Sequence, residues 1–438
     1  MELISILLQL TVFVLFFSIG FPINKAQVNN LNNRSKFLEQ LIFNIFIQLN
    51  LLLVLSFFNI SIKLIFSIYL SYLLISLVYL IKINSIKSFF IFKNKLLYYF
   101  AYSLCLVIFI DIAYSLTLEW DSQKFWIYKT LNFYNDGTIQ SLNNLPPGDG
   151  ANYPYLGSLL WSLFWKFSFI PDEYSGRLLY GFLYIISLLA ITEKLNTSIV
   201  YKMIFLVVFV SLSYQYRYFG GDQDILIFIL IAFLSVVTHD IYKASTKKVS
   251  NLQIILLILI CNSLIWTKPE GTVYAFIMIS IISLFFKIEF IKKFYLFSSV
   301  SLLFILQILL YKYYGLNVGI NPCCWTDFSV NSIISKISIE RILVISQYFF
   351  YSLFKSPFFI LGLICLISSI FVKNLIKNFF YIYFFIIINF SFIFTAYILS
   401  DLNLVFMLKN GIDRLFYGSS PIYLLIFVEY YNSQKFKN

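Results

Sequence analysis

Charged residues are scarce in this chain: they make up 12% of its 438 residues, whereas a soluble domain has about 25%. So little charge cannot cover a soluble surface, and 60% of the residues are hydrophobic. Apolar runs recur along the whole length, and runs of about 18 or more apolar residues are typical of membrane spans. The sequence therefore predicts a polytopic membrane protein and not a soluble domain with a single anchor.

Residues that bind transition metals are also scarce. The only histidine is His239, and one histidine cannot form a metal cluster, so we assign it no role. Three of the five cysteines lie in apolar spans, where cysteine behaves as a small hydrophobic residue. The adjacent Cys323 and Cys324 lie in a loop, either as a disulfide or as two free thiols, and we favour thiols. No spacing indicates a zinc site.

About 13 membrane spans account for most of the apolar sequence. We expect them at residues 3–21, 41–58, 62–81, 96–116, 178–194, 199–214, 224–241, 251–266, 271–287, 293–311, 357–372, 378–399 and 414–430. The first has no basic n-region and no cleavage site of a signal peptide, so we expect it to be retained. Two short apolar stretches, 155–170 and 341–354, favour helices at the membrane interface. The predicted fold class is an all-α polytopic membrane protein.

Lysine and arginine are distributed unequally between alternate loops. If the loop 82–95 is cytoplasmic, the segments on that side hold 19 basic and five acidic residues, a net charge of +14. The remainder holds 13 basic and 15 acidic residues, a net charge of −2, which agrees with +12 for the chain. This distribution predicts an extracytoplasmic N-terminus and a cytoplasmic C-terminus. Membrane topology explains the excess of basic residues. The sequence has no basic domain that would indicate nucleic-acid binding.

The segment 118–177 is the longest polar stretch, and the charge distribution places it outside. It combines acids, Trp and Tyr with a predicted amphipathic helix at 122–134 and a turn-rich loop at 143–150. Asp121 stands in this segment among aromatic residues, where partial desolvation would make it a better base. Taken alone, a solvated acid beside an aromatic belt is the more common explanation. Glu119 is a weaker candidate for the same role.

Further ionisable residues fall on the same predicted face, and each has two readings. Arg177 is either an interface anchor or a phosphate contact. Asp222 and Asp224 follow two glycines at a helix start, which suits a divalent cation such as Mg²⁺ or Mn²⁺, or equally a stabilised helix N-terminus. Lys268 lies in a tight turn, where it can simply pair with a nearby Glu. Arg414 suits bidentate binding of phosphate oxygens.

The order of these motifs resembles the GT-C superfamily of integral-membrane glycosyltransferases, which includes the aminoarabinose and protein-mannosyl transferases. The residues that carry the resemblance are Trp120-Asp121-Ser122, Asn135-Asp136-Gly137, Tyr153-Pro154-Tyr155, Gly176-Arg177, Asp222 or Asp224, Lys268 to Gly271, and Asp413-Arg414. The likeness covers about residues 96–425. The chain departs from the pattern at Ser122, where many members have a second acid, and in lacking a large C-terminal outer domain.

The resemblance implies two parts, three additional N-terminal helices in 1–95 and a GT-C-like catalytic module in 96–438. It implies transfer of a hexosyl or pentosyl unit from a polyprenyl-phosphate donor to a glycan, lipid or protein acceptor, with inversion. Asp121 would deprotonate the acceptor hydroxyl. Arg177, Lys268 or Arg414 would stabilise the departing phosphate, with Tyr153 also at the substrate. The setting would be the extracytoplasmic face of a bacterial inner membrane, in cell-envelope glycan synthesis.

Two other functions compete with this one. A multi-pass transporter or flippase places ionisable groups near the middle of the bilayer, and Asp111, inside its span, supports that reading. A non-catalytic membrane assembly subunit would leave these acids merely solvated. The acids cluster at the predicted outer boundary, which favours the transferase.

Overall fold

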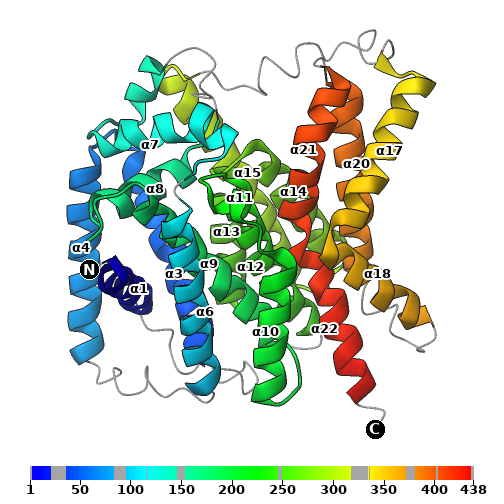
Figure 1. The fold of residues 1–438 in the computed structure, drawn as a ribbon, viewed down its shortest axis with the longest axis horizontal. Coiled ribbons are helices and arrows are strands. Elements are labelled where there is room, and N and C mark those ends of the chain that lie inside the picture. The colour runs from blue at the N-terminus through cyan, green and yellow to red at the C-terminus, as the bar shows by residue number, and fades with distance from the viewer. Residues whose placement is uncertain are drawn as a thin grey trace.

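The computed structural model describes residues 2–20, 36–82, 95–115, 117–145, 153–244, 249–316, 334, 336–370, 380–400 and 403–435. These residues form helices and connecting turns, with no strand among them. Figure 1 shows most of the helices running side by side, with α7 and α8 lying across them near one end. The prediction of an all-α polytopic fold is confirmed at this level.

The helices of the first half occupy the following bounds: α1 (Glu2–Ser18), α3 (Lys36–Ser56), α4 (Ile62–Lys82), α6 (Lys95–Tyr114), the π-helix η1 (Ser122–Trp126), α7 (Ile127–Tyr134), the 3₁₀-helix η2 (Gln140–Asn144), α8 (Leu156–Lys166), α9 (Tyr174–Thr192) and α10 (Ile199–Ser213). Those of the second half are α11 (Tyr216–Phe219), α12 (Asp224–Lys243), α13 (Asn251–Ile265), α14 (Pro269–Phe285), α15 (Phe290–Tyr313), α17 (Ile339–Lys355), α18 (Pro357–Ile370), α20 (Phe380–Leu399), α21 (Leu404–Ser419) and α22 (Pro421–Lys435).

Seven helices in the described part of the chain are long and apolar enough to cross a membrane: α3, α4, α6, α9, α12, α15 and α20. The count becomes eight if α17 and α18, which meet at a bend of 85°, form one broken span. The shorter apolar helices are α1, α10, α13 and α14. A multi-pass membrane protein follows, while the total of about 13 spans remains a prediction.

Two predicted elements differ in detail from the structure. The expected last span, 414–430, is divided between α21 and α22, and Pro421 begins the second of them, since proline is tolerated only in the first turn of a helix. The stretch 155–170 forms α8, as expected, but nine of its 11 residues are buried inside the protein. The helix at 122–134 is present and begins with the π-helical turn η1.

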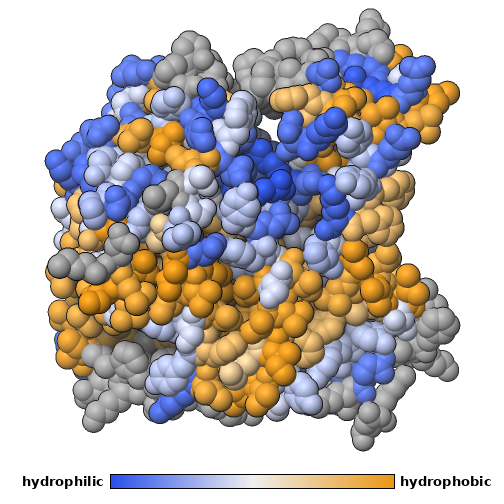
Figure 2. Space-filling model, in the orientation of Figure 1, coloured by the Kyte–Doolittle hydropathy of each residue, from blue (hydrophilic) through white to orange (hydrophobic). Residues whose placement is uncertain are grey.

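α9 and α12 form the centre of the bundle. All 19 residues of α9 are buried, and a helix that is apolar all round is expected in a core. In contrast, α4, α6, α15 and α20 bury only 22–33% of their apolar windows, which leaves broad apolar surfaces for lipid. On the face shown in Figure 2, a hydrophobic band crosses the lower half and a more hydrophilic surface lies above it.

The ion pairs agree with the predicted alternation of loops. Each Lys or Arg ion pair among the described residues joins two residues that the charge distribution assigned to the same face. Arg414 with Asp121 is an outer example, and Lys194 with Asp240 is an inner one. The sorting into two faces is therefore self-consistent, and which face is extracytoplasmic stays a prediction.

Several polar residues outside the predicted site form contacts between helices. Asn50 of α3 accepts a hydrogen bond of 2.6 Å from Asn262 of α13, which fixes the N-terminal helices to the rest of the bundle. His239, to which we assigned no role, lies 3.1 Å from both Glu429 and Tyr381 and links α12 to α22 and α20. The three cysteines in apolar helices are buried and free. The Cys323-Cys324 pair lies outside the described residues.

Candidate functional site

Arg414 of α21 stands at the centre of a partly buried charge cluster. Its Nη1 forms an ion pair with Asp121, its Nη2 lies 3.1 Å from Asp222 Oδ1, and its Nε lies 2.5 Å from Asp224 Oδ2. Lys268 Nζ donates to the other oxygen of Asp224 over 2.7 Å. We call these five residues the Arg414 cluster. They come from four separate segments, and all five were singled out from the sequence.

Backbone contacts bring the segment of Asp121 to the loop that carries Asp222. The amide of Glu119 donates to the carbonyl of Gly220 over 3.1 Å. Gly221 has a φ of +89°, and a Cβ there would lie 2.3 Å from a ring carbon of Trp161. A residue without a side chain is therefore required at this turn.

The helix starts orient the remaining members. Asp224 is the first residue of α12, and its amide lies 3.4 Å from Asp222 Oδ1, so the interpretation of these acids as partners of a helix N-terminus is partly right. Lys268 directly precedes α14, with Pro269 at the first helical position, where proline is favoured. Lys268 and Asp224 are 5% and 4% exposed, so their pair is almost wholly desolvated.

The cluster holds three carboxylates and two cations in a buried environment. Burial raises the pKa of Asp222 to about 7; Asp224 and Asp121 add to this effect, and Arg414 and Lys268 oppose it. Burial alone would disfavour the Lys268 ammonium, but Asp224 raises its pKa above the ordinary value. The charge of Asp222 therefore changes near neutral pH.

The predicted residue Arg177 lies elsewhere, with its donors engaged. Its Nε and Nη2 donate to the two carboxylate oxygens of Glu173 over 2.8 and 3.0 Å, and its Nη1 donates to the carbonyl of Phe219 over 2.9 Å. The side chain is 1% exposed. These contacts join α9 to α11 and give Arg177 a positioning role for the loop that follows Phe219.

The hydrogen bonds of the Tyr153 carbonyl are made with residues outside the Arg414 cluster. Its carbonyl accepts hydrogen bonds from Lys129 Nζ over 2.5 Å and from the Tyr311 hydroxyl over 3.1 Å. Burial lowers the pKa of Lys129 well below the ordinary value. Tyr153 thus stabilises the packing of the outer segment, and its predicted contact with substrate stays a prediction.

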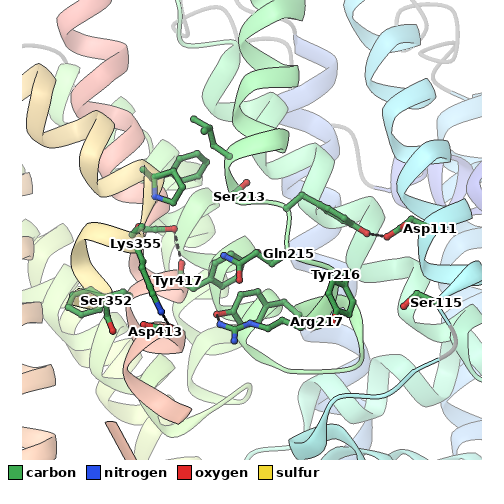
Figure 3. Close-up of a pocket in the computed structure, with 18 residues that line it drawn as sticks. Asp111, Ser115, Ser213, Gln215, Tyr216, Arg217, Ser352, Lys355, Asp413 and Tyr417 are labelled. Carbon is green, nitrogen blue, oxygen red and sulfur yellow. Dashed lines mark hydrogen bonds and ion pairs between the residues drawn. The ribbon is translucent and has the colours of Figure 1, made fainter. Parts of the chain in front are cut away.

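A cavity of about 880 Å³ opens between α6, α10, α11, the bend from α17 to α18, and α21. α21 supplies Arg414 to the Arg414 cluster and the adjacent Asp413 to the wall of the cavity. The cluster and the cavity are therefore neighbours. In the view of Figure 3, Asp111 and Lys355 lie at opposite sides of the cavity, with Arg217 between them.

Sequence reasoning placed Arg217 on the outer face without a role, and Lys355 was missed. The Ser356-Pro357 step after Lys355 was a usable signal, because the residue before proline often ends a helix.

The carboxylates predicted to bind a divalent cation already neutralise side-chain cations. Both oxygens of Asp224 are engaged, one by Lys268 and one by Arg414. In the described part of the chain, no three His, Cys, Asp or Glu residues are arranged to hold a metal ion. A divalent ion at this place would face two resident cations. We therefore derive no step through a metal, and the predicted Mg²⁺ or Mn²⁺ remains to be tested.

No protein-family model matches the chain, and neither a curated protein nor a solved structure shows significant similarity to it. The resemblance to the GT-C superfamily therefore rests on motif order alone.

Proposed function

We propose that this protein is a membrane glycosyltransferase of GT-C type that transfers a hexosyl or pentosyl unit from a polyprenyl-phosphate donor to a glycan, lipid or protein acceptor. The observation that supports this most is the convergence of Asp121 with Arg414, Lys268 and two further acids beside a cavity. These residues were selected from their order in the chain, and charged groups gathered in a buried place commonly mark function.

Asp121 is the proposed general base. Its Oδ2 is held by Arg414, and the side chain is 20% exposed, so its other oxygen can reach an acceptor hydroxyl. The hydroxyl proton passes to that oxygen while the acceptor oxygen attacks the anomeric carbon. The bond from this carbon to the phosphate oxygen breaks, and the lipid phosphate leaves with both electrons. Attack from the opposite side inverts the anomeric centre.

Arg414 orients Asp121 in this scheme. Because the same guanidinium also contacts Asp222 and Asp224, its positive charge is shared among three carboxylates and does not belong to Asp121 alone. A rotamer fixed by an ion pair is the kind of preorganisation that catalytic geometry requires. Asp222 and Asp224 are thus proposed as positioning residues for Arg414.

A lipid-linked donor agrees with the charge distribution. The Arg414 cluster lies on the face that holds the acid-rich loops, which is the predicted extracytoplasmic face. Nucleotide sugars are cytosolic, so a transferase acting on that face needs a donor carried by the membrane. The proposed location is the bacterial inner membrane, with the reaction in the synthesis of an envelope glycan.

The test compares Asp121→Asn with Asp172→Asn, a matched change at an exposed acid of the same outer segment. Each variant is expressed in a deletion strain, and the glycolipids are profiled by mass spectrometry. We expect Asp121→Asn to keep normal expression and to lose the product that the wild type restores, while Asp172→Asn restores it. A profile restored by Asp121→Asn would contradict the proposed role of this carboxylate and favour an assembly subunit.

A flippase is the second candidate, because Asp111 of α6 lines the cavity and accepts a hydrogen bond from the Tyr214 hydroxyl. The bend between α17 and α18 at the same cavity resembles the broken helices of transporters. A vesicle assay that follows the movement of a fluorescent prenyl phosphate across the bilayer separates the two. Transport that needs Asp111 and is indifferent to Asp121→Asn would favour the flippase.

A further inference from the structure

The cations predicted to bind phosphate are already paired with carboxylates. Arg177 binds Glu173, Lys268 binds Asp224, and Arg414 contacts three acids of its cluster. Releasing Lys268 or Arg414 would remove a partner from the buried Asp224, which is costly, and releasing Arg177 would leave the partly buried Glu173 without its cation. A phosphate group at this site therefore needs other cations.

Arg217 and Lys355 meet that requirement, and both line the cavity. Arg217 forms no ion pair within 4.0 Å in the described part of the chain. Its Nη2 donates to the neutral Tyr218 hydroxyl over 2.6 Å, and its buried Nε has no acceptor. Lys355 is 50% exposed and lies 3.7 Å from Asp413, a distance too long for a strong hydrogen bond.

The rest of the cavity wall includes both polar and apolar side chains. Ser356 directly follows Lys355, and Ser352 precedes it by three positions on α17; both hydroxyl groups can donate to phosphate oxygens. Apolar side chains of Leu212, Phe358 and Phe416 also line the cavity. A volume of about 880 Å³ is within the usual range for a bound small molecule. This combination suits a ligand with an anionic head and an apolar tail.

We propose that this cavity binds the phosphate head of a lipid, with Arg217 and Lys355 contacting the phosphate and the apolar wall contacting the first part of the lipid chain. The proposal rests on the proposed function only for the prenyl nature of that chain. Two acids face the ligand as well. Asp111 is engaged by Tyr214, and Asp413 competes with the phosphate for Lys355.

The experiment measures binding of farnesyl phosphate to the purified protein in phosphatidylcholine nanodiscs, with farnesol and inorganic phosphate as comparisons. We expect Arg217→Gln and Lys355→Gln each to weaken farnesyl phosphate binding by about tenfold or more, since each removes a charge-assisted contact. Lys409→Gln, an exposed lysine of α21 away from the cavity, is the matched control and should bind normally. Binding that is unchanged in both cavity variants would overturn the proposal.

The comparison ligands separate the head from the chain. Farnesol that competes as well as farnesyl phosphate would overturn the anion contact, and inorganic phosphate that binds equally tightly would overturn the lipid contact. Asp413→Asn removes the competing acid and should tighten farnesyl phosphate binding. This variant, with Arg217→Lys, keeps the proposal testable if Arg217→Gln fails to fold.

The two proposals can fail separately. Binding that depends on Arg217 in a protein that transfers no sugar would support the lipid-phosphate cavity and contradict the transferase. Sugar transfer that is lost in Asp121→Asn but unaffected by Arg217→Gln and Lys355→Gln would do the opposite.

Discussion

Arg414 Nε lies 2.5 Å from Asp224 Oδ2, although 190 positions separate the two residues in the chain. The contact joins α21 to the start of α12, the helix at the centre of the bundle. It also places Arg414 where it reaches Asp121. The stability of the protein and the geometry of its proposed base therefore depend on the same guanidinium.

Replacing Asp224 with Asn should destabilise the protein strongly. The change leaves Lys268 without its carboxylate, and breaking a buried ion pair on one side costs about 3–5 kcal/mol. We expect the melting temperature of the detergent-solubilised protein to fall by several degrees, while Asp172→Asn leaves it unchanged. The double variant Asp224→Asn with Lys268→Met should recover part of the loss, because no buried cation is then left unpaired. A double variant no more stable than the single one would contradict this account.

The stability should depend on pH through Asp222. Its pKa is raised to about 7 in the folded protein, against about 3.9 when unfolded. The folded state therefore binds the additional proton between these values, so stability falls as pH rises through this interval. We expect the melting temperature of the wild type relative to Asp222→Asn to fall from about pH 4 to about pH 7 and then to level off. A difference that stays constant over this range would show that Asp222 does not titrate there.

Gly221 offers a test of how the loop before α12 is built. Alanine at this position would suffer both from the positive φ and from contact with Trp161. Gly315→Ala is the matched control, because Gly315 also has a positive φ, of +72°, but the nearest atom to its Cβ would be 3.5 Å away. We expect Gly221→Ala to lower the melting temperature more than Gly315→Ala does and to reduce sugar transfer. Equal shifts would mean that backbone strain alone matters and that Trp161 can move aside.

Chelation tests the predicted metal ion. Since Lys268 and Arg414 already occupy the oxygens of Asp224, we expect sugar transfer by purified protein to persist in excess EDTA. Loss of transfer in EDTA that added Mg²⁺ or Mn²⁺ restores would favour the metal site that the spacing of Asp222 and Asp224 first indicated.

Sequence patterns predicted the helices well because long apolar runs have few alternatives in lipid. They also selected the members of the Arg414 cluster, since charges near the predicted membrane boundary are conspicuous in so apolar a chain. They did not predict which charge pairs with which, because ion pairing depends on helix packing and not on local sequence. Glu173 and Arg177 carry a local signal that our sequence analysis did not use: their i, i+4 spacing is that of a helical salt bridge, and the structure has this pair.

The cavity could not be predicted in the same way. Its wall is assembled from six helices, α6, α10, α11, α17, α18 and α21, and its position depends on the bend between α17 and α18. The burial of α8 was also beyond pattern analysis, because a short apolar helix looks the same whether lipid or protein covers it. Both features arise from tertiary packing, which the period of apolar residues does not encode.

Arg177→Lys separates a positioning role from the phosphate contact predicted for this arginine. Lysine cannot reproduce the bidentate contact with Glu173 and the additional bond to the carbonyl of Phe219. We expect a melting temperature lowered by several degrees, but farnesyl phosphate affinity within about twofold of the wild type in the folded fraction, in contrast to Arg217→Gln. The opposite result would be an affinity reduced about tenfold with an unchanged melting temperature. It would indicate that Arg177 contacts the phosphate and would contradict the role proposed for the cavity. The two arginines thus make exclusive predictions, because Arg177 is paired with the carboxylate of Glu173, whereas Arg217 forms no ion pair in the described part of the chain.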